Sequence, residues 1–241
     1  MRVIHASGRF DKPLGQSVLR GWASQCSVML HTEAVAGKTD REQDRIGAID
    51  RLPGWLQRWD GRELAIGWDS ERWVYVSHNV HELGAYTQGD GDQIPKRLLI
   101  VRLQRPEGMK ADIASASFAV MHTPAHIEGE LLGTSALTRR GREWRGIVAR
   151  AADILERETQ LTVLGADWNV NYLRRGGKNL LDRTISFDFD LVPAASKEPT
   201  HGSRLIDLFA VSHGFVTRAD TLELTPASDH KPVHLEMKRR R

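Results

Sequence analysis

Short apolar segments recur along almost the whole chain, and helical patterns interrupt them only rarely. Nine segments read as strands: residues 2–6, 27–31, 63–68, 72–77, 97–104, 114–121, 161–165, 205–211 and 232–237. The clearest helix is residues 138–158, where apolar side chains keep a 3.6-residue period. Shorter helices are expected over residues 13–24 and, interrupted near Pro53-Gly54, over residues 40–59. So many strands with so few helices between them predict two packed sheets flanked by helices, rather than strict alternation of strand and helix.

The chain is long enough for one large domain, and no linker-like segment or internal repeat divides its 241 residues. We therefore predict a single domain over residues 1–237. No run of about 18 apolar residues indicates a membrane span, and the N-terminus lacks the apolar core of a secretory signal. The single cysteine, Cys26, excludes an internal disulfide and fits a reducing compartment. We expect a cytoplasmic monomer.

The charge of the chain is concentrated at its C-terminus. The formal net charge is +3, and residues 238–241, Lys-Arg-Arg-Arg, supply four positive charges. The rest of the chain has 30 basic and 31 acidic residues, so the body of the protein is nearly neutral. A basic tail at 238–241 can hold a polyanion, or it can be a solvated end that aids solubility.

An apolar strand ends in a carboxylate and an amide within residues 163–169, Val-Leu-Gly-Ala-Asp-Trp-Asn. Residues two apart on an extended chain face the same way, so Asp167 and Asn169 are expected to point into one pocket. A carboxylate can bind a metal or orient water, and an amide can hold a phosphate oxygen. Both residue types also end strands through their own backbone hydrogen bonds, so this motif alone leaves a purely structural turn open.

Two earlier strands also end in residues that carry chemistry. Glu33 follows the strand 27–31, and His122 follows the strand 114–121. His122 and His126 are four residues apart, a spacing that binds zinc on a helix. Pro124 lies between them and argues against a helix, so a zinc site is the weaker interpretation.

The segment before the last strand contains Ser228-Asp229-His230. Adjacent residues on an extended chain face opposite ways, so these three cannot converge into a Ser-His-Asp triad. Asp229 and His230 are therefore expected to serve two different partners.

Taken in order, these segments resemble the motifs of the endonuclease/exonuclease/phosphatase superfamily, the deoxyribonuclease I-like metal-dependent phosphoesterases. The resemblance spans residues 2–237. It implies an α/β fold of two packed, mostly antiparallel β-sheets flanked by helices, a four-layer α/β sandwich. It also implies a divalent cation, Mg²⁺ or Mn²⁺, bound by Glu33 with Asp229 nearby. Such hard cations prefer oxygen ligands and keep several waters.

The resemblance also implies the catalytic residues. His230 would exchange a proton with water or with the leaving group, and Asp207 would fix its tautomer. Asp167 is the rival general base. Asn169 and His122 would hold phosphate oxygens.

Two positions depart from the family pattern. Thr32 replaces a glutamine, and Ser7 stands where the family has an asparagine that helps position metal or phosphate. A hydroxyl can still make a hydrogen bond, so Ser7 is kept as a substrate-binding residue. Arg174 and Arg175 follow the Asp-Trp-Asn motif and would grip a nucleic-acid backbone or form a solvated loop.

We predict a divalent-metal-dependent phosphodiester hydrolase, and a nuclease acting on DNA or RNA ahead of a phosphatase or phospholipid phosphodiesterase of the same superfamily. A P-loop at residues 36–39 would need a glycine where Thr32 stands. A catalytically weakened domain that only binds a phosphorylated partner fits Ser7. However, the gathered carboxylates would repel a phosphate unless a cation lay between them.

Overall fold

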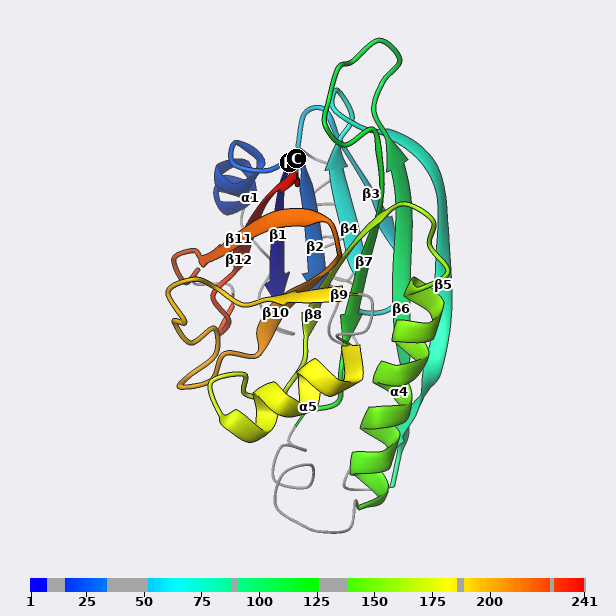
Figure 1. The fold of residues 1–241 in the computed structure, drawn as a ribbon, viewed down its shortest axis with the longest axis vertical. Helices are drawn as coiled ribbons and strands as arrows, with labels where there is room; N and C mark the ends of the chain where they lie inside the picture. The colour runs from blue at the N-terminus through cyan, green and yellow to red at the C-terminus, as the bar shows by residue number, and fades with distance from the viewer. Residues whose placement is uncertain are drawn as a thin grey trace.

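Two six-stranded sheets pack face to face at the centre of the molecule, and helices cover their outer faces (Figure 1). This computed structural model describes residues 1–7, 16–33, 52–87, 91–125, 138–185, 189–225 and 228–240. The predicted P-loop segment, His126 and most of the predicted helix 40–59 lie outside these ranges.

Sheet I joins the two ends of the sequence. Its strands, in spatial order, are β11 (Phe215–Thr221), β12 (Val233–Arg239), β1 (Arg2–Ser7), β2 (Val28–Thr32), β4 (Ala65–Asp69) and β3 (Trp55–Trp59). Within this sheet β1 and β2 are parallel and the other neighbours are antiparallel.

Sheet II comes from the middle of the chain. Its order is β5 (Val74–Thr87), β6 (Gln93–Gln104), β7 (Ser115–His122), β8 (Leu161–Asp167), β10 (Asp207–Ser212) and β9 (Phe189–Val192). Here β7 and β8 are the parallel pair. Two packed, mostly antiparallel sheets were predicted, and the structure confirms them.

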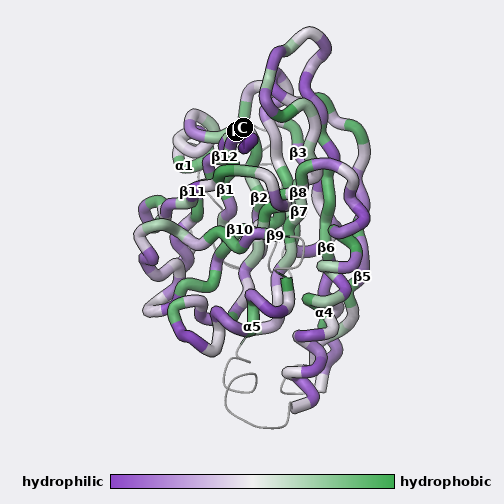
Figure 2. The backbone as a smooth tube through the Cα atoms, viewed as in Figure 1, coloured by the Kyte–Doolittle hydropathy of each residue, from purple (hydrophilic) through white to green (hydrophobic). Residues whose placement is uncertain are grey.

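Three helices among the described residues complete the layers: α1 (Gln16–Ala23), α4 (Arg139–Leu155) and α5 (Arg175–Ile185). α1 packs its Leu19 and Trp22 on the outer face of sheet I. α4 and α5 cover the outer face of sheet II with an apolar stripe that includes Trp144, Ile147 and Leu181. A third apolar cluster fills the space between the sheets. Figure 2 shows the outward sides of α4 and α5 as hydrophilic.

Several predicted elements differ from the structure. Residues 55–59 form strand β3 instead of the end of a helix, because Trp55 and Gln57 are buried while Leu56 and Arg58 are exposed, the two-residue period of a strand. Gly54, at a φ of 76°, makes the break. β11 was not predicted, because apolar and polar residues alternate only weakly along its sequence, Phe-Val-Thr-Arg-Ala-Asp-Thr.

No helix or strand was predicted within residues 174–199, yet they contain α5 and β9. Two adjacent glycines hid the helix, and one of them is required by packing. A Cβ on Gly177 would lie 2.2 Å from the carbonyl oxygen of Asn171, so no other residue fits there.

The predicted basic tail begins inside a strand. β12 extends to Arg239, and Lys238 and Arg239 pair with Val216 and Phe215 of β11. These two residues therefore belong to sheet I, and the tail is correspondingly shorter than expected. None of the helices formed by the described residues is long and apolar enough to cross a membrane. Cys26 is buried and free.

Candidate active site

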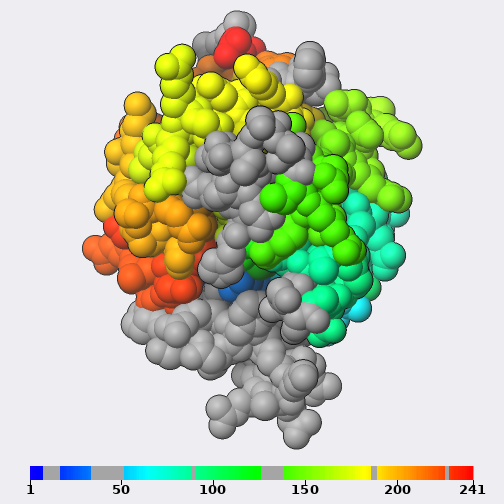
Figure 3. Space-filling view, turned by 90° about the horizontal axis from the view of Figure 1, so that it is seen from below, coloured from blue at the N-terminus to red at the C-terminus, as the bar shows by residue number. Residues whose placement is uncertain are grey.

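Three strands of sheet II place three predicted residues side by side, where β7 and β8 end and β10 begins. β7 and β8 run parallel, in a register that pairs His122 with Asp167. β10 runs antiparallel to β8, and its first residue, Asp207, pairs with Asp167. All three residues are buried. Figure 3 looks at this end of the sandwich, where the green segment of β7 and the orange and red C-terminal segments reach the same face.

Sheet I contributes residues from the facing strand ends. Ser7 ends β1 and pairs with Thr32, the last residue of β2. Glu33 follows at once with a φ of 52°, a strained backbone for a non-glycine residue and one that often marks a functional site. His230 precedes β12, and its backbone N–H donates to Ser228 Oγ at 2.9 Å. Ser228 in turn donates to the carbonyl oxygen of Ser7 at 2.6 Å, which ties the two segments together.

Asp207 and His230 form the first carboxylate–histidine pair. His230 Nδ1 lies 2.8 Å from Asp207 Oδ2, and both side chains are buried. Burial by itself would lower the pKa of His230, but the Asp207 carboxylate outweighs it and raises that pKa to about 10. Asp207 thus lies where it can fix the tautomer of His230 and leave Nε2 for chemistry.

His122 and Glu63 form a second carboxylate–histidine pair, 2.9 Å apart between Nδ1 and Oε2. The other oxygen of Glu63 accepts from the buried Lys96 ammonium at 3.3 Å. Burial would raise the pKa of Glu63, but His122 and Lys96 lower it to about 2. The pKa of His122 is raised, since Glu63 outweighs the opposing effects of burial and of Lys96.

Glu33 and Asp167 lie on the far side of His122 from Glu63. Their oxygens are 3.7 and 3.8 Å from His122 Nε2. Burial, with a contribution from Asp167, raises the pKa of Glu33 to about 7. Burial and the neighbouring Asp207 raise the pKa of Asp167 to about 6. Burial thus disfavours the ionised form of both carboxylates, and a bound cation would stabilise that form.

The atoms around these carboxylates suit a hard divalent cation. Glu33 and Asp167 offer oxygen ligands, and the hydroxyls of Ser7 and Thr32 are buried without a hydrogen-bond partner. Oxygen donors are what Mg²⁺ and Mn²⁺ prefer. Among the described residues, three-residue groups able to hold a metal are His201–Asp229–His230 and Asp167–Asp207–His230.

Asp229 lies at the mouth of the site beside a histidine that the sequence did not reveal. Its Oδ2 is 3.4 Å from His201 Nε2, and the His201 ring centroid is 4.5 Å from that of His230. Arg204 donates to His201 Nδ1 at 2.9 Å. The proton of a neutral His201 is therefore on Nε2, where it donates toward Asp229 and leaves no lone pair for a metal.

Asn169 shows that the Asp-Trp-Asn motif is both a turn and part of the site. It also has a φ of 52°, and its N–H donates to Asp167 Oδ1 at 3.0 Å. Its side-chain amide donates to the carbonyl oxygen of Thr123 at 3.0 Å, next to His122. One oxygen of Asp167 thus forms the turn, while the other faces His122.

The three predicted substrate-binding residues lie in two different places. Ser7 is buried beneath the site, with 2% of its surface exposed. Arg174 and Arg175 are exposed at the N-terminus of α5, outside the buried cluster. Glu63, Lys96 and His201 belong to the cluster and were missed by sequence reasoning. Only Glu63, a carboxylate just before a strand, carried a recognisable signal.

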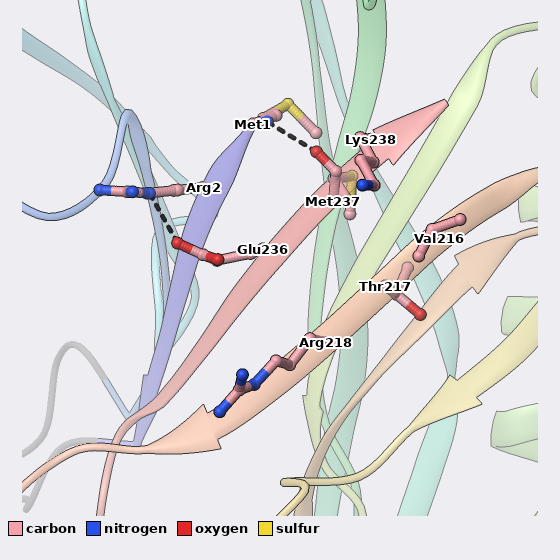
Figure 4. Close-up of a pocket in the computed structure, with 8 residues that line it drawn as sticks. All are labelled: Met1, Arg2, Val216, Thr217, Arg218, Glu236, Met237 and Lys238. Atoms are coloured by element: carbon pink, nitrogen blue, oxygen red, sulfur yellow. Dashed lines mark hydrogen bonds and ion pairs between the residues drawn. The ribbon is translucent and has the colours of Figure 1, made fainter. Parts of the chain in front are cut away.

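A pocket of about 300 Å³ lies elsewhere, across β1, β11 and β12 near the chain termini (Figure 4). Its two arginines are already paired with carboxylates. Arg2 binds Glu236 at 2.8 Å, and Arg218 binds Asp220 at 2.9 Å. The lining residues include no histidine and only one carboxylate, Glu236, so the pocket does not compete with the cluster as a candidate active site.

The chain matches known proteins by its structure and not by its sequence. No protein-family model and no curated protein sequence matches the chain. Solved structures do match. An endonuclease/exonuclease/phosphatase from Bacteroides vulgatus superposes with a TM-score of 0.67 at 13% identity, over 99% of this chain and 98% of that one. The TDP2 of D. rerio complexed with a single-strand DNA product gives 0.68 at 10% identity, over 99% and 98%. A mannosyl-6-phosphatase from Bacteroides thetaiotaomicron gives 0.63 at 15% identity, over 98% and 99%.

Proposed function

We propose, from the endonuclease/exonuclease/phosphatase fold of this chain and from its buried cluster, that it is a divalent-metal-dependent phosphodiester hydrolase and a nuclease. The observation that carries the proposal is the pair of carboxylate–histidine contacts, His230–Asp207 and His122–Glu63, which join the two sheets at one end of the sandwich. Fold alone would not support a reaction, because function depends on the site.

The side chains divide naturally into a proton donor and a proton acceptor. With a pKa of about 10, His230 is an imidazolium at neutral pH and can protonate a leaving oxygen through Nε2. With a pKa of about 6, Asp167 can take a proton from an attacking water. Environments that push the pKa values of two groups apart are typical of acid–base pairs. His122, whose pKa Glu63 raises, and Asn169 would hold the phosphate oxygens.

Glu33 would hold a Mg²⁺ or Mn²⁺ ion, with Asp229 as a further candidate ligand at the mouth. When bound, the cation supplies charge that offsets the phosphate and its transition state. Glu33 fits this role because its buried carboxylate lies close to that of Asp167, a crowding of negative charge that a cation relieves.

The two helices on sheet II favour a nucleic-acid substrate. α4 and α5 together carry eight basic and three acidic residues, a net charge of +5 within a body whose total charge is close to zero. Arg175 and Lys178 of α5 are exposed, at the end of the sandwich where β8 finishes. Basic residues at the start of α5, a few positions after the Asp167–Asn169 turn, would attract a phosphate backbone.

One substrate panel tests the proposal. Plasmid DNA, RNA, abasic DNA, inositol phosphates and sphingomyelin are each incubated with Mg²⁺, Mn²⁺ or EDTA. We expect nucleic-acid cleavage that EDTA stops and either cation restores, and a loss of about 10²–10⁴-fold in rate for His230→Ala. His213→Ala is the matched control, because His213 is a half-exposed histidine bound to Asp190 outside the cluster. Full activity in EDTA would contradict the metal dependence, and cleavage of the small phosphoesters alone would contradict the nuclease.

A further inference from the structure

A third buried histidine, His5, lies behind the Asp207–His230 pair. It belongs to β1 and is completely buried. Its Nδ1 is 3.8 Å from Asp207 Oδ1, the oxygen that does not contact His230. The edge of its ring meets Phe209 of β10, with centroids 6.1 Å apart and an angle of 77°. His5 therefore reaches from sheet I across to sheet II, directly beneath the proposed acid.

The polar atoms at this contact have no other partners. Both ring nitrogens of His5 and Oδ1 of Asp207 are buried without a hydrogen bond. Leaving such atoms unpaired is costly, so each is the natural partner of the other. Their separation is too long for a hydrogen bond and too short for a bridging water. A ring shift of roughly 1 Å would close it.

The ring can accept this role because it is neutral. Burial lowers the pKa of His5 to about 4. A neutral imidazole has one N–H, and the Asp207 carboxylate beside Nδ1 favours the tautomer with the proton there. His5 can therefore donate to Asp207 without adding a second buried positive charge beside His230.

A glycine in the facing sheet lies against the ring. A Cβ on Gly165 of β8 would lie 2.9 Å from Leu30 Cδ1, 3.0 Å from His5 Cδ2 and 3.1 Å from His5 Cβ. Those distances are tighter than ordinary contacts, so a side chain at Gly165 would displace Leu30 and His5. The missing side chain at residue 165 therefore leaves room for both.

The second carboxylate–histidine pair has an equivalent support. Lys96 donates to the free oxygen of Glu63 from inside the fold, just as His5 approaches the free oxygen of Asp207. Each carboxylate then uses one oxygen for its catalytic histidine and presents the other to a buried donor.

We propose that His5 is a positioning residue for the Asp207–His230 pair, and that its Nδ1–H is the donor that holds Asp207 Oδ1. The role rests on the proposed function, since it acts through His230. With Oδ1 held, the carboxylate cannot rotate, and Oδ2 stays directed at the ring that delivers the proton.

Two substitutions separate positioning from packing. His5→Leu fills the space without a donor, while His5→Asn places an amide nitrogen at the same number of bonds from Cα as Nδ1. On bis(p-nitrophenyl) phosphate with Mn²⁺, we expect His5→Leu to lower kcat by roughly 10–100-fold with little change in KM. His5→Asn should recover most of that loss. Equal kcat values for the two variants would overturn the proposal.

A second measurement does not depend on turnover. In protein labelled with ¹⁵N-histidine, the Nδ1–H resonance of His230 reports its bond to Asp207, with His230→Gln providing the assignment. This resonance should move in His5→Leu and return toward wild type in His5→Asn. An unchanged resonance in both would overturn the role of His5. Absence of hydrolysis by the wild-type protein would instead count against the proposed function alone.

His5→Met gives a third variant should His5→Leu fail to fold. Its thioether fills the space but cannot donate a hydrogen bond, so kcat should fall as expected for His5→Leu. A kcat for His5→Met equal to that of His5→Asn would overturn the proposal.

Discussion

Glu33 and Glu63 are both glutamates at the same sheet edge, yet their pKa values move in opposite directions. Burial raises the pKa of Glu33 to about 7, and the partners of Glu33 include another carboxylate, Asp167. The pKa of Glu63 falls to about 2, because His122 and Lys96 outweigh the same effect of burial. Residue identity therefore does not decide the charge at this site; the neighbours do. Glu63 stays ionised and raises the pKa of His122, whereas the ionised form of Glu33 needs a cation to stabilise it.

Metal binding should therefore depend on pH. The pKa of Glu33 is higher in the folded protein, about 7, than its ordinary value of 4.5, so without metal its contribution to stability is lost as pH rises between those values. A cation reverses this loss by binding the ionised carboxylate. We expect Mn²⁺ to raise the melting temperature more at about pH 8 than at about pH 5, with a stabilisation of about 2.7 kcal/mol at 100 times the Kd.

Differential scanning fluorimetry in EDTA and in Mn²⁺ measures this effect. Glu33→Gln is the control, because it removes one of two carboxylates that titrate in this interval, the other being Asp167. It should reduce the difference between the Mn²⁺ shifts in melting temperature at the two pH values. The interval stays above the folded pKa of Glu63, about 2, so that carboxylate remains ionised throughout. An equal Mn²⁺ shift at both pH values would contradict the assignment of Glu33.

Glu63→Gln tests the second pair. The amide keeps the shape of Glu63 but loses the charge that raises the pKa of His122. We expect kcat to fall roughly 10–100-fold, with circular dichroism unchanged. Glu82→Gln is a suitable control, since Glu82 is a largely exposed glutamate of β5. Loss of activity in both variants would show a general effect of charge.

At the scale of elements, helix α4 fixes the strand end that carries the site. Trp144 of α4 donates its indole N–H to the carbonyl oxygen of Trp168 at 3.3 Å. Trp168 lies between Asp167 and Asn169, and its own indole donates to the carbonyl oxygen of Leu208, next to Asp207, at 3.3 Å. Two buried tryptophans thus join the helix to β8 and β10. The placement of α4 on sheet II therefore bears on the geometry of the acid–base residues.

Thr138 starts this helix and offers a direct test of its stability. Its hydroxyl accepts from the N–H of Gly141 at 3.1 Å, as expected of an N-cap. Thr138→Ala should lower the free energy of unfolding by about 1 kcal/mol. Thr138→Ser keeps the acceptor and should lose less than half as much. Urea denaturation measures both, and equal losses would show that the methyl group matters more than the cap.

At the scale of the molecule, the charges are separated. The termini lie at one end of the sandwich, and the strand ends that carry the site lie at the other (Figure 1). Lys238 and Arg240 are therefore remote from the cluster, while α5, which carries Arg175 and Lys178, lies at the same end of the sandwich as the cluster. We therefore expect a nucleic acid that is being cleaved to contact Arg175 and Lys178 before it contacts Lys238 and Arg240.

Salt dependence should distinguish these two basic surfaces. Neutralising Arg175 and Lys178 to glutamine should reduce the slope of log Kd against log salt by about 1 for every phosphate that the protein no longer neutralises. Neutralising Lys238 and Arg240 in the same way should leave the slope nearly unchanged. Fluorescence anisotropy with labelled DNA in Ca²⁺ or EDTA measures binding without cleavage. The opposite ranking would move the nucleic-acid surface to the C-terminus.

The sequence by itself determined which residues end which strands, because strand periodicity and polar strand ends are local properties of the chain. That was enough to predict two packed sheets and to place His122 and Asp167 at strand ends, whereas Asp207 and the role of His230 were named only from the resemblance to the superfamily. Local signals were weaker where Gly176 and Gly177 open α5, and at β3, where the burial of Trp55 and Gln57 is set by neighbouring strands.

Only the tertiary structure decided which polar residues became partners. Glu63 meets His122 across 59 positions of the chain, and His5 approaches Asp207 from the other sheet. No local pattern encodes such pairs, since they depend on strand register and on the packing of one sheet against the other. The same packing removes water from the carboxylates and so sets their pKa values, which is why the chemistry of the site emerges only in the folded protein.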